Sequence, residues 1–306
     1  MIELERLLRS QGFGSRADCR ALVRSGSVWV AGQLCDNPFA RFDTDGLSFT
    51  VDGVTWLYRR FAYLALHKPA GYECSQRPLH HPSVYSLLPD PLLTRGVQAV
   101  GRLDEDSTGL LLLTDDGQFI HRYTSPKKAV PKVYEVTTRH GVDAPQMSAL
   151  LAGVVLNDDP RPVAAQDCVL LGPRCLRLTV TEGRYHLVKR MLAAAGNRVE
   201  ALHRISIGGF VLPASLAVGK WMWLETAELD VAYYDSDDVL RTPDHQFTNQ
   251  AWSVGANYRT RDSSEVRFNI STAYRPPHVS ELYSEGLHHG AAAIELGDAR
   301  LGSERA

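Results

Sequence analysis

Apolar and polar positions along the chain predict both strands and helices. The most apolar run, residues 110–113, consists of four leucines between Gly109 and the pair Asp116 and Gly117, which predicts a buried core strand followed by a turn. The segment SVWVAG alternates apolar and small residues up to Gly32 and predicts a strand that enters a tight turn. Acidic residues lie on both sides of the leucine run, so they either punctuate a buried strand or take part in chemistry.

A short basic helix is predicted near the N-terminus. Ser15 followed three residues later by Asp18 is a capping-box pattern, and Gly26 supplies a stop, so residues 16–25 are expected to be helical. Arginines at every fourth position place three guanidinium groups on one face: Arg16, Arg20 and Arg24. Such a face suits a surface that tracks phosphates, although a solvated helix has the same spacing.

A second amphipathic helix is predicted in HLVKRMLAAAG, where Gly196 supplies the stop. A helical wheel gives an apolar face made of Leu187, Val188, Met191, Leu192 and Ala195. The opposite face holds His186, Lys189 and Arg190. One face is therefore expected to pack against the protein while the other presents cations.

The composition is that of a globular protein. The 306 residues are 44% hydrophobic and 22% charged, which suits two domains of about 150 residues each. Five cysteines form no C-x-x-C pair, and their odd number without a secretory leader favours a reducing, cytoplasmic location. No apolar run approaches the roughly 20 residues of a membrane-spanning helix, so no membrane partner is expected.

The chain changes character near residue 230. Residues 1–229 carry 26 Lys and Arg against 23 Asp and Glu, a net charge of +3, whereas residues 230–306 carry 7 against 12, a net charge of −5. In this tail QAWSVGANYRT and EVRFNISTAYRP alternate with period two, which predicts two strands. The stretch AYRPPHVSELYSEGLHHGAAAIELGDARLGSE resembles part of the barrel of TonB-dependent receptors.

A tail of about 75 residues supplies too few strands to close a barrel. We therefore expect residues 230–306 to be a foreign, receptor-like tail, β-patterned or disordered and loosely packed, rather than an independent domain. The alternative is a genuine accessory extension.

Three interpretations compete for GRLDEDSTG at residues 101–109. In the first, the acids only flank the buried strand. In the second, Asp104 and Asp106 begin the D-x-D-x-T motif of a haloacid-dehalogenase-type phosphatase. That motif needs an apolar strand before its first aspartate, where this chain has Gly101 and Arg102, and no convincing acidic pair follows downstream. In the third, Asp104 acts with residues far along the chain.

Four separated segments carry the third interpretation. They are YLALHKPAGYECS, GRLDEDSTGLLLLTDDG, KVYEV and EGRYHLVKRMLAAAGNRVEALHRISIGG, and in this order they resemble the RNA pseudouridine synthases that act on small-subunit (16S) ribosomal RNA. Ahead of them, LERLLRSQGFGSRADCRALVRSGSVWVAG resembles the S4-type RNA-binding domain. The resemblance implies an α+β protein, with an S4-like domain at 1–58 and a catalytic domain with a mixed, mainly antiparallel sheet at 59–229.

The resemblance also implies an activity, the isomerisation of one specific uridine in 16S ribosomal RNA to pseudouridine. That reaction breaks the bond between C1′ and N1 and rejoins the base through C5, so it is redox-neutral and we expect no cofactor and no metal. The partner would be small-subunit ribosomal RNA or a pre-ribosomal particle, bound by a monomer. The alternative is a non-catalytic RNA-binding factor in ribosome assembly.

By resemblance, three residues form the catalytic set, and their joint presence argues against the non-catalytic alternative. Asp104 is the catalytic aspartate, acting either as a nucleophile or as a base. Tyr134 is the aromatic platform for the flipped uracil. Lys189 is the cation beside a carboxylate that would otherwise tend to protonate in a partly dry pocket. A core tyrosine in a strand and a solvated lysine on a helix are the rival interpretations.

Further basic residues are candidates for contacts with RNA phosphates. They are Arg16, Arg20, Arg24, Lys68, Arg102, Lys127, Lys128, Lys132, Arg184, His186 and Arg190. A solvated loop would carry the lysines ahead of KVYEV equally well. His80 and His81 lack partner ligands at useful spacing, so a surface turn is expected there rather than a metal site.

Overall fold

The computed structural model describes residues 1–157 and 159–225, together with the backbone of short strands between Tyr233 and Arg305. The chain divides into two compact units, residues 1–230 and 231–306. Every helix in the described part of the chain is too short or too polar to cross a bilayer.

The N-terminal module packs two helices against a small sheet. The helices are α1 (Leu4–Ser10) and α2 (Arg16–Arg24), and the sheet has the order β3 (Gln33–Leu34), β2 (Val28–Val30), β5 (Ser48–Val51), β6 (Val54–Leu57), with β1 (Ile2–Glu3) paired to β4 (Arg41–Phe42). The predicted capping box is present, because Ser15 accepts from the Asp18 amide and Asp18 accepts from the Ser15 amide. The predicted helix and the SVWV strand are therefore confirmed.

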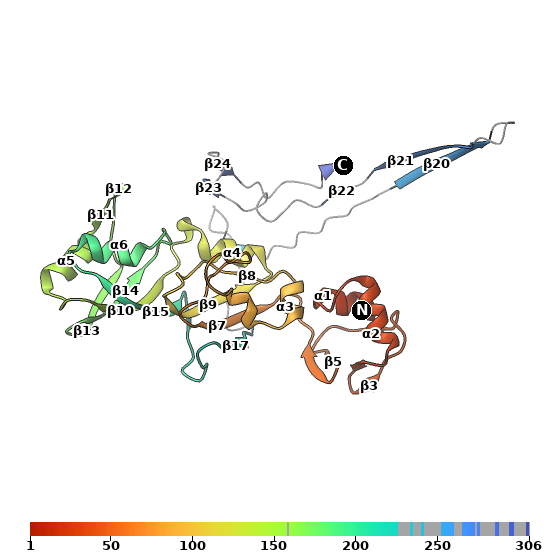
Figure 1. Ribbon diagram of the computed structural model, residues 1–306, viewed down its shortest axis with the longest axis horizontal. Coiled ribbons are helices and arrows are strands. Elements are labelled where there is room, and N and C mark those ends of the chain that lie inside the picture. Colours follow the sequence, from red (N-terminus) through yellow and green to blue (C-terminus); the bar gives the residue numbers. More distant parts are fainter. Residues whose placement is uncertain are drawn as a thin grey trace. The chain divides into compact units, whose positions relative to one another are not determined.

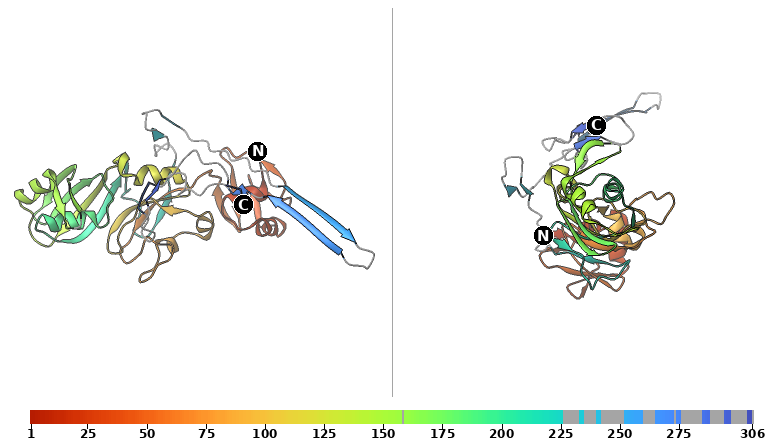
Figure 2. Two further views of the ribbon diagram at one scale, coloured as in Figure 1. Left: turned by 90° about the horizontal axis from the view of Figure 1, so that it is seen from above. Right: turned by 90° about the vertical axis from the view of Figure 1, so that its left-hand side faces the viewer.

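The rest of the first unit is built on one large sheet. Its strands follow the order β13 (Asp167–Gly172), β14 (Cys175–Val180), β10 (Lys132–Thr138), β15 (Val199–Ile207), β9 (Thr108–Thr114), β7 (Tyr63–Lys68), β17 (Trp221–Trp223), with β16 (Phe210–Val211) beside β15 and β8 (Gln98–Ala99) beside β9. The strands lie side by side in Figures 1 and 2. Only the β15–β9 pair is parallel, which confirms the mixed, mainly antiparallel sheet.

Helices and a small hairpin complete this part of the fold. They are α3 (Asp90–Thr94), α4 (Gly117–Thr124), α5 (Ala144–Ala152), α6 (Leu187–Ala194), the 3-10 helices Val84–Leu87 and Pro126–Lys128, and the hairpin of β11 (Val154–Leu156) and β12 (Asp159–Val163). The apolar faces of α5 and α6 pack with β10 and β14 into one core, whereas α3 packs with β7 and β9 into another. Figure 1 shows α5 and α6 beside the green strands.

Strand β9 contains the leucine run that the sequence predicted to be buried. All four leucines are at most 1% exposed, between β7 on one side and β15 on the other. The predicted turn after the strand is wrong, because Asp116 accepts hydrogen bonds from the amides of Gln118 and Phe119 and so begins helix α4. The two signals are alike, since an aspartate oxygen that favours a turn also caps a helix.

A close approach of two backbones fixes the start of β9. Gly109 has φ +105°, and a Cβ atom there would overlap the backbone of Arg204 in the parallel strand β15. Glycine accepts this conformation and this contact without strain. The loop of residues 101–107, which leads directly into β9, is thereby placed against β15.

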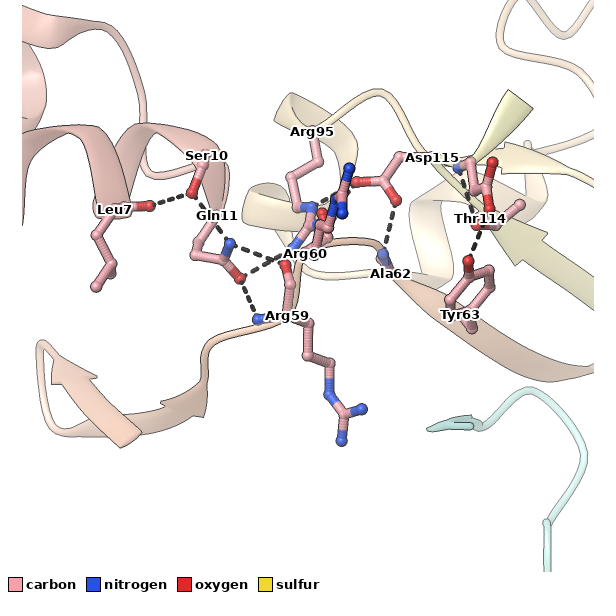
Figure 3. Close-up of polar contacts among 11 residues, drawn as sticks. Leu7, Ser10, Gln11, Arg59, Arg60, Ala62, Tyr63, Arg95, Thr114 and Asp115 are labelled. Atoms are coloured by element: carbon pink, nitrogen blue, oxygen red, sulfur yellow. Dashed lines mark hydrogen bonds and ion pairs between the residues drawn. The ribbon is translucent and has the colours of Figure 1, made fainter. Parts of the chain in front are cut away.

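A polar cluster joins the N-terminal module to the large sheet (Figure 3). Gln11, which is 5% exposed, donates to the carbonyl of Arg59 at 3.0 Å and accepts from the Arg59 amide at 3.1 Å. Arg95 donates to Gln11 at 2.9 Å and to Asp115 at 2.7 Å, and Asp115 also accepts from the Ala62 amide at 2.6 Å. Asp115 is therefore a largely enclosed acid with a structural role, and burial raises its pKa although Arg95 and the amide oppose the shift.

The second unit is described only by short antiparallel strand pairs. These are β18 (Tyr233–Tyr234) with β19 (Leu240–Arg241), β20 (Trp252–Arg259) with β21 (Glu265–Thr272), β22 (Tyr274–Arg275) with β25 (Glu304–Arg305), and β23 (Glu285–Leu287) with β24 (Ile294–Leu296). Strands β20 and β21 are the two that the alternating segments predicted. The other positions of the predicted tail lie outside the described residues, and its resemblance to a receptor barrel stays a prediction.

Candidate active site

The loop of residues 101–107 presents Asp104 at the end of β9 and is held by a buried lysine. Lys68 is 0% exposed and donates to the carbonyls of Ser107 at 2.7 Å, Pro69 at 3.0 Å and Glu105 at 3.2 Å. Burial lowers the pKa of Lys68, although nearby acidic groups oppose the shift. The predicted RNA contact of Lys68 is wrong, because its ammonium group is enclosed and supports the loop.

Asp104 lies between two basic side chains at the start of α6. Lys189 Nζ is 3.0 Å from one carboxylate oxygen of Asp104, and His186 Nε2 is 3.1 Å from the other. The apolar face of α6 is buried as predicted, which turns Lys189 toward the loop. His186 precedes the helix with φ +49°, a left-handed conformation that is uncommon for a residue with a side chain.

Asp106 also belongs to this cluster, although the sequence analysis named it only as part of the phosphatase-like motif. Lys189 Nζ is 2.7 Å from Asp106, so one ammonium group bridges two carboxylates two residues apart. Partial burial lowers the pKa of Lys189, but the hydrogen bonds to Asp106 and Asp104 outweigh this effect and raise it. Partial burial likewise raises the pKa of Asp106, but Lys189 outweighs this and lowers it.

A cavity of about 130 Å³ opens beside Asp104. Tyr134 of β10, which is 9% exposed, lines it, and Asp104 and Tyr134 therefore meet at one cavity although 30 residues separate them in the sequence. Lys132 lines the cavity two residues before Tyr134, and burial together with Arg204 lowers its pKa to about 8. The predicted residues Arg102, Arg184 and His186 also belong to the lining.

Arg204 of β15 is a site residue that no sequence signal marked. It is 2% exposed, donates from Nε to the Leu110 carbonyl at 2.8 Å, and has its guanidinium carbon 6.0 Å from the centroid of the Tyr134 ring. Its Nη2 atom has no hydrogen-bond partner within the part of the chain that the structure describes. A buried guanidinium with an unused donor places positive charge beside the cavity.

The remaining predicted RNA contacts are more scattered. Arg184 is paired with Asp159 at 3.1 Å and Glu182 at 2.6 Å, so acids of the chain balance its charge. Arg16 and Arg20 both pair with Glu5 of α1, which ties part of the predicted arginine face to the module itself. The rest of this set comprises Arg24, Lys127 and Lys128, which are exposed, and Arg190, whose Nη1 donates to the Tyr185 carbonyl at 3.0 Å.

The described residues contain no group of three or more His, Cys, Asp or Glu side chains placed to hold a metal ion. His80 and His81 are exposed, and their backbone amides donate to Glu73 at 2.9 Å and 3.0 Å, which makes this segment a tight surface turn.

The chain is similar to known proteins over about three quarters of its length. Residues 62–194 match the RNA pseudouridylate synthase family. Ribosomal small subunit pseudouridine synthase A of Yersinia pestis is 43% identical over 208 residues, 68% of this chain and 83% of that protein. The uncharacterized RNA pseudouridine synthase YtzG of Bacillus subtilis is 36% identical over 231 residues, 74% of this chain and 97% of that protein.

A solved structure gives the same result. A crystal structure of a pseudouridylate synthase is 33% identical and has a TM-score of 0.53, covering 74% of this chain and 98% of the solved chain. The family match includes the loop with Asp104, the strand with Tyr134 and the helix with Lys189, all of which lie within residues 62–194. The chain belongs to the RNA pseudouridine synthase family, whose members are isomerases.

Proposed function

We propose that this chain converts one specific uridine of small-subunit (16S) ribosomal RNA to pseudouridine, with Asp104 as the catalytic carboxylate. The observation that carries the proposal is the placement of Asp104 between Lys189 and His186 at the mouth of the cavity that Tyr134 lines. Relatives named ribosomal small subunit pseudouridine synthase A, 36–43% identical, support this choice of RNA. The substrate would be the RNA or a pre-ribosomal particle, bound by a cytoplasmic monomer.

Each group has a distinct task in this reaction. The target uridine leaves its stack and its base enters the cavity against Tyr134. Asp104 then either attacks C1′ and displaces N1, or removes the 2′ proton to give a glycal. In both routes the detached uracil turns so that C5 faces C1′. In the first route C5 bonds to C1′ as the bond between Asp104 and C1′ breaks, and in the second C5 adds to C1′ of the glycal while Asp104 returns the proton to C2′. The proton on C5 is then released to solvent.

The charges around Asp104 suit this chemistry. Lys189 and His186 hold the carboxylate in one orientation, and a cation at 3.0 Å stabilises its negative charge in a site that is partly shielded from water. Arg102, an exposed residue of the same loop, lies beside the cavity and is placed for a phosphate of the bound RNA.

Tritium release from RNA labelled at uridine C5 tests the proposal directly, because the C5 hydrogen is lost only when the base is rejoined. The wild-type chain is expected to release tritium from a small-subunit ribosomal RNA transcript or from an assembly intermediate, and Asp104→Asn is expected to release none. Glu105→Gln is the matched control, since this exposed neighbour lies in the same loop. Absence of release by the wild type from both substrates refutes the activity, and release by Asp104→Asn refutes the assignment of Asp104.

A further inference from the structure

Two cavities meet at Asp104. The inner cavity, of about 130 Å³, is lined by Tyr134, and an adjoining outer one, of about 440 Å³, shares part of its lining. Both are lined by Arg102, Leu103, Asp104 and His186. Tyr134 belongs only to the inner cavity and Tyr185 only to the outer one. The proposed reaction uses the inner cavity alone, so the larger outer cavity has no role in it.

Tyr185 is an exposed aromatic residue that the fold nevertheless holds in place. Tyr185 is 67% exposed. One face of its ring stacks on the His186 ring, with centroids 3.7 Å apart and an interplanar angle of 22°. His186 is in turn fixed by Asp104 at 3.1 Å, and Arg190 donates to the Tyr185 carbonyl at 3.0 Å. A ring held in this way, with much of its surface in solvent, is suited to stacking with a flat ligand.

Hydrogen bonds within the protein also fix the part of the outer cavity that Glu73, His80 and His81 line. Glu73 accepts hydrogen bonds from three successive backbone amides, those of Leu79, His80 and His81, at 2.9–3.1 Å. These bonds shape the turn that carries His80 and His81 along the cavity. The outer cavity is therefore bounded by an ordered turn on one side and by Tyr185 on the other.

We propose that the outer cavity binds the nucleotide next to the target uridine in the RNA chain, and that the base of this nucleotide stacks on Tyr185. The inference rests on the proposed function. With the uracil in the inner cavity, its C1′ atom lies at Asp104, and the phosphates of that nucleotide lie on the ribose side. The RNA chain therefore continues away from Tyr134, toward the adjoining cavity, which Asp104 also lines and Tyr134 does not.

The chemistry of the outer cavity fits a nucleotide. Its volume leaves room for a nucleotide beyond the one in the inner cavity, and Tyr185 supplies a stacking surface. Arg102 lines both cavities, which places a guanidinium near the phosphate that links the two nucleotides. Stacking tolerates any base, so this site holds the RNA in register without reading the identity of the neighbour.

A thermodynamic cycle tests the inference. The modified uridine is first mapped with the wild-type chain, and the RNA is then prepared with an abasic nucleotide at the position before or after it. Tyr185→Ala is expected to lower kcat/KM on intact RNA about 5- to 150-fold, the range that stacking of one base on an aromatic ring gives. Tyr185→Phe, which keeps the ring, is expected to lose much less. Val169→Ala, an exposed site on β13, is the control for unspecific surface effects.

The decisive comparison combines both changes. At one of the two neighbouring positions, the abasic nucleotide is expected to reduce kcat/KM of the wild type as much as Tyr185→Ala does, and to cause no further loss in Tyr185→Ala. Additive losses at both positions, or wild-type activity of Tyr185→Ala, overturn the inference. A loss seen only on pre-ribosomal particles and not on naked RNA also overturns it, because it indicates a protein partner. Failure of the proposed function is distinct, since the wild type itself would then release no tritium.

Discussion

The buried ion pair of Arg95 and Asp115 makes a quantitative prediction about how the N-terminal module is held. Arg95→Met keeps an unbranched apolar stem but removes the guanidinium that bonds Asp115, Gln11 and the Arg60 carbonyl. The side chains of Arg95 and Asp115 are 3% and 15% exposed, so solvent cannot replace the lost partner. Removing one member of a buried pair costs about 3–5 kcal/mol, and we expect the free energy of unfolding to fall by this amount at pH 7.

The loss should depend on pH because Asp115 can take up a proton. Burial already raises the pKa of Asp115 with Arg95 present, and removal of Arg95 raises it further. A carboxyl whose folded-state pKa is above its unfolded value of about 3.9 destabilises the fold when the pH rises through the folded-state pKa. The difference in the free energy of unfolding between wild type and Arg95→Met is therefore expected to have its full size at pH 7 and to shrink as the pH falls toward 4.

Urea denaturation at pH 7 and at pH 4.5 measures this difference. Arg95→Met combined with Asp115→Asn should recover part of the stability, since no unpaired charge then remains buried. Arg41→Met is the control, because its exposed pair with Glu3 contributes about 1 kcal/mol or less. The reasoning is refuted if Arg95→Met loses no more than this control, if its loss is the same at both pH values, or if Asp115→Asn restores nothing.

Three further predictions concern the proposed site and the tail. Lys189→Met should lower kcat/KM for tritium release about 10²- to 10³-fold, as loss of one preorganised electrostatic partner does, whereas Asp106→Asn should lower it about 5-fold or less because this pair is partly exposed. Lys132, with its pKa near 8, is charged below that pH, so RNA affinity should fall as the pH rises from 7 to 9 in filter-binding titrations, and Lys132→Arg should abolish this dependence. Removal of residues 230–306 should leave tritium release intact, because the proposed catalytic residues and the family match at residues 62–194 lie ahead of them; inactive or insoluble 1–229 protein would contradict this.

Local signals in the sequence were sufficient where the structure depends on neighbours in the chain. The capping box of Ser15 and Asp18 predicted the start of α2, and the leucine run predicted β9. The helical wheel separated the buried face of α6 from the face with Lys189. These features depend on periodicity and short-range hydrogen bonds, which a sequence displays directly.

The errors and omissions involve contacts between distant segments. Lys68 follows an apolar strand and looks like a cation at a strand end, yet its ammonium group reaches three carbonyls of other residues. Asp106 belongs to the site because Lys189 of α6 contacts it. Arg204 belongs to the site because its strand, β15, pairs in parallel with β9. Asp115 pairs with Arg95, 20 residues earlier in the chain. No spacing rule reports such partners, and Asp104 itself was selected by resemblance rather than by pattern.

Two lysines hold the catalytic loop in different ways, and the difference suits the proposed reaction. Lys68 is fully buried and binds main-chain carbonyls, so it fixes the backbone of the loop. Lys189 is partly exposed and binds the carboxylates of Asp104 and Asp106. If Asp104 attacks C1′, its negative charge disappears in the covalent intermediate, and Lys189 loses one of its partners. Asp106 then remains as its counter-ion, so the step leaves no partly buried cation unpaired and the loop backbone need not move.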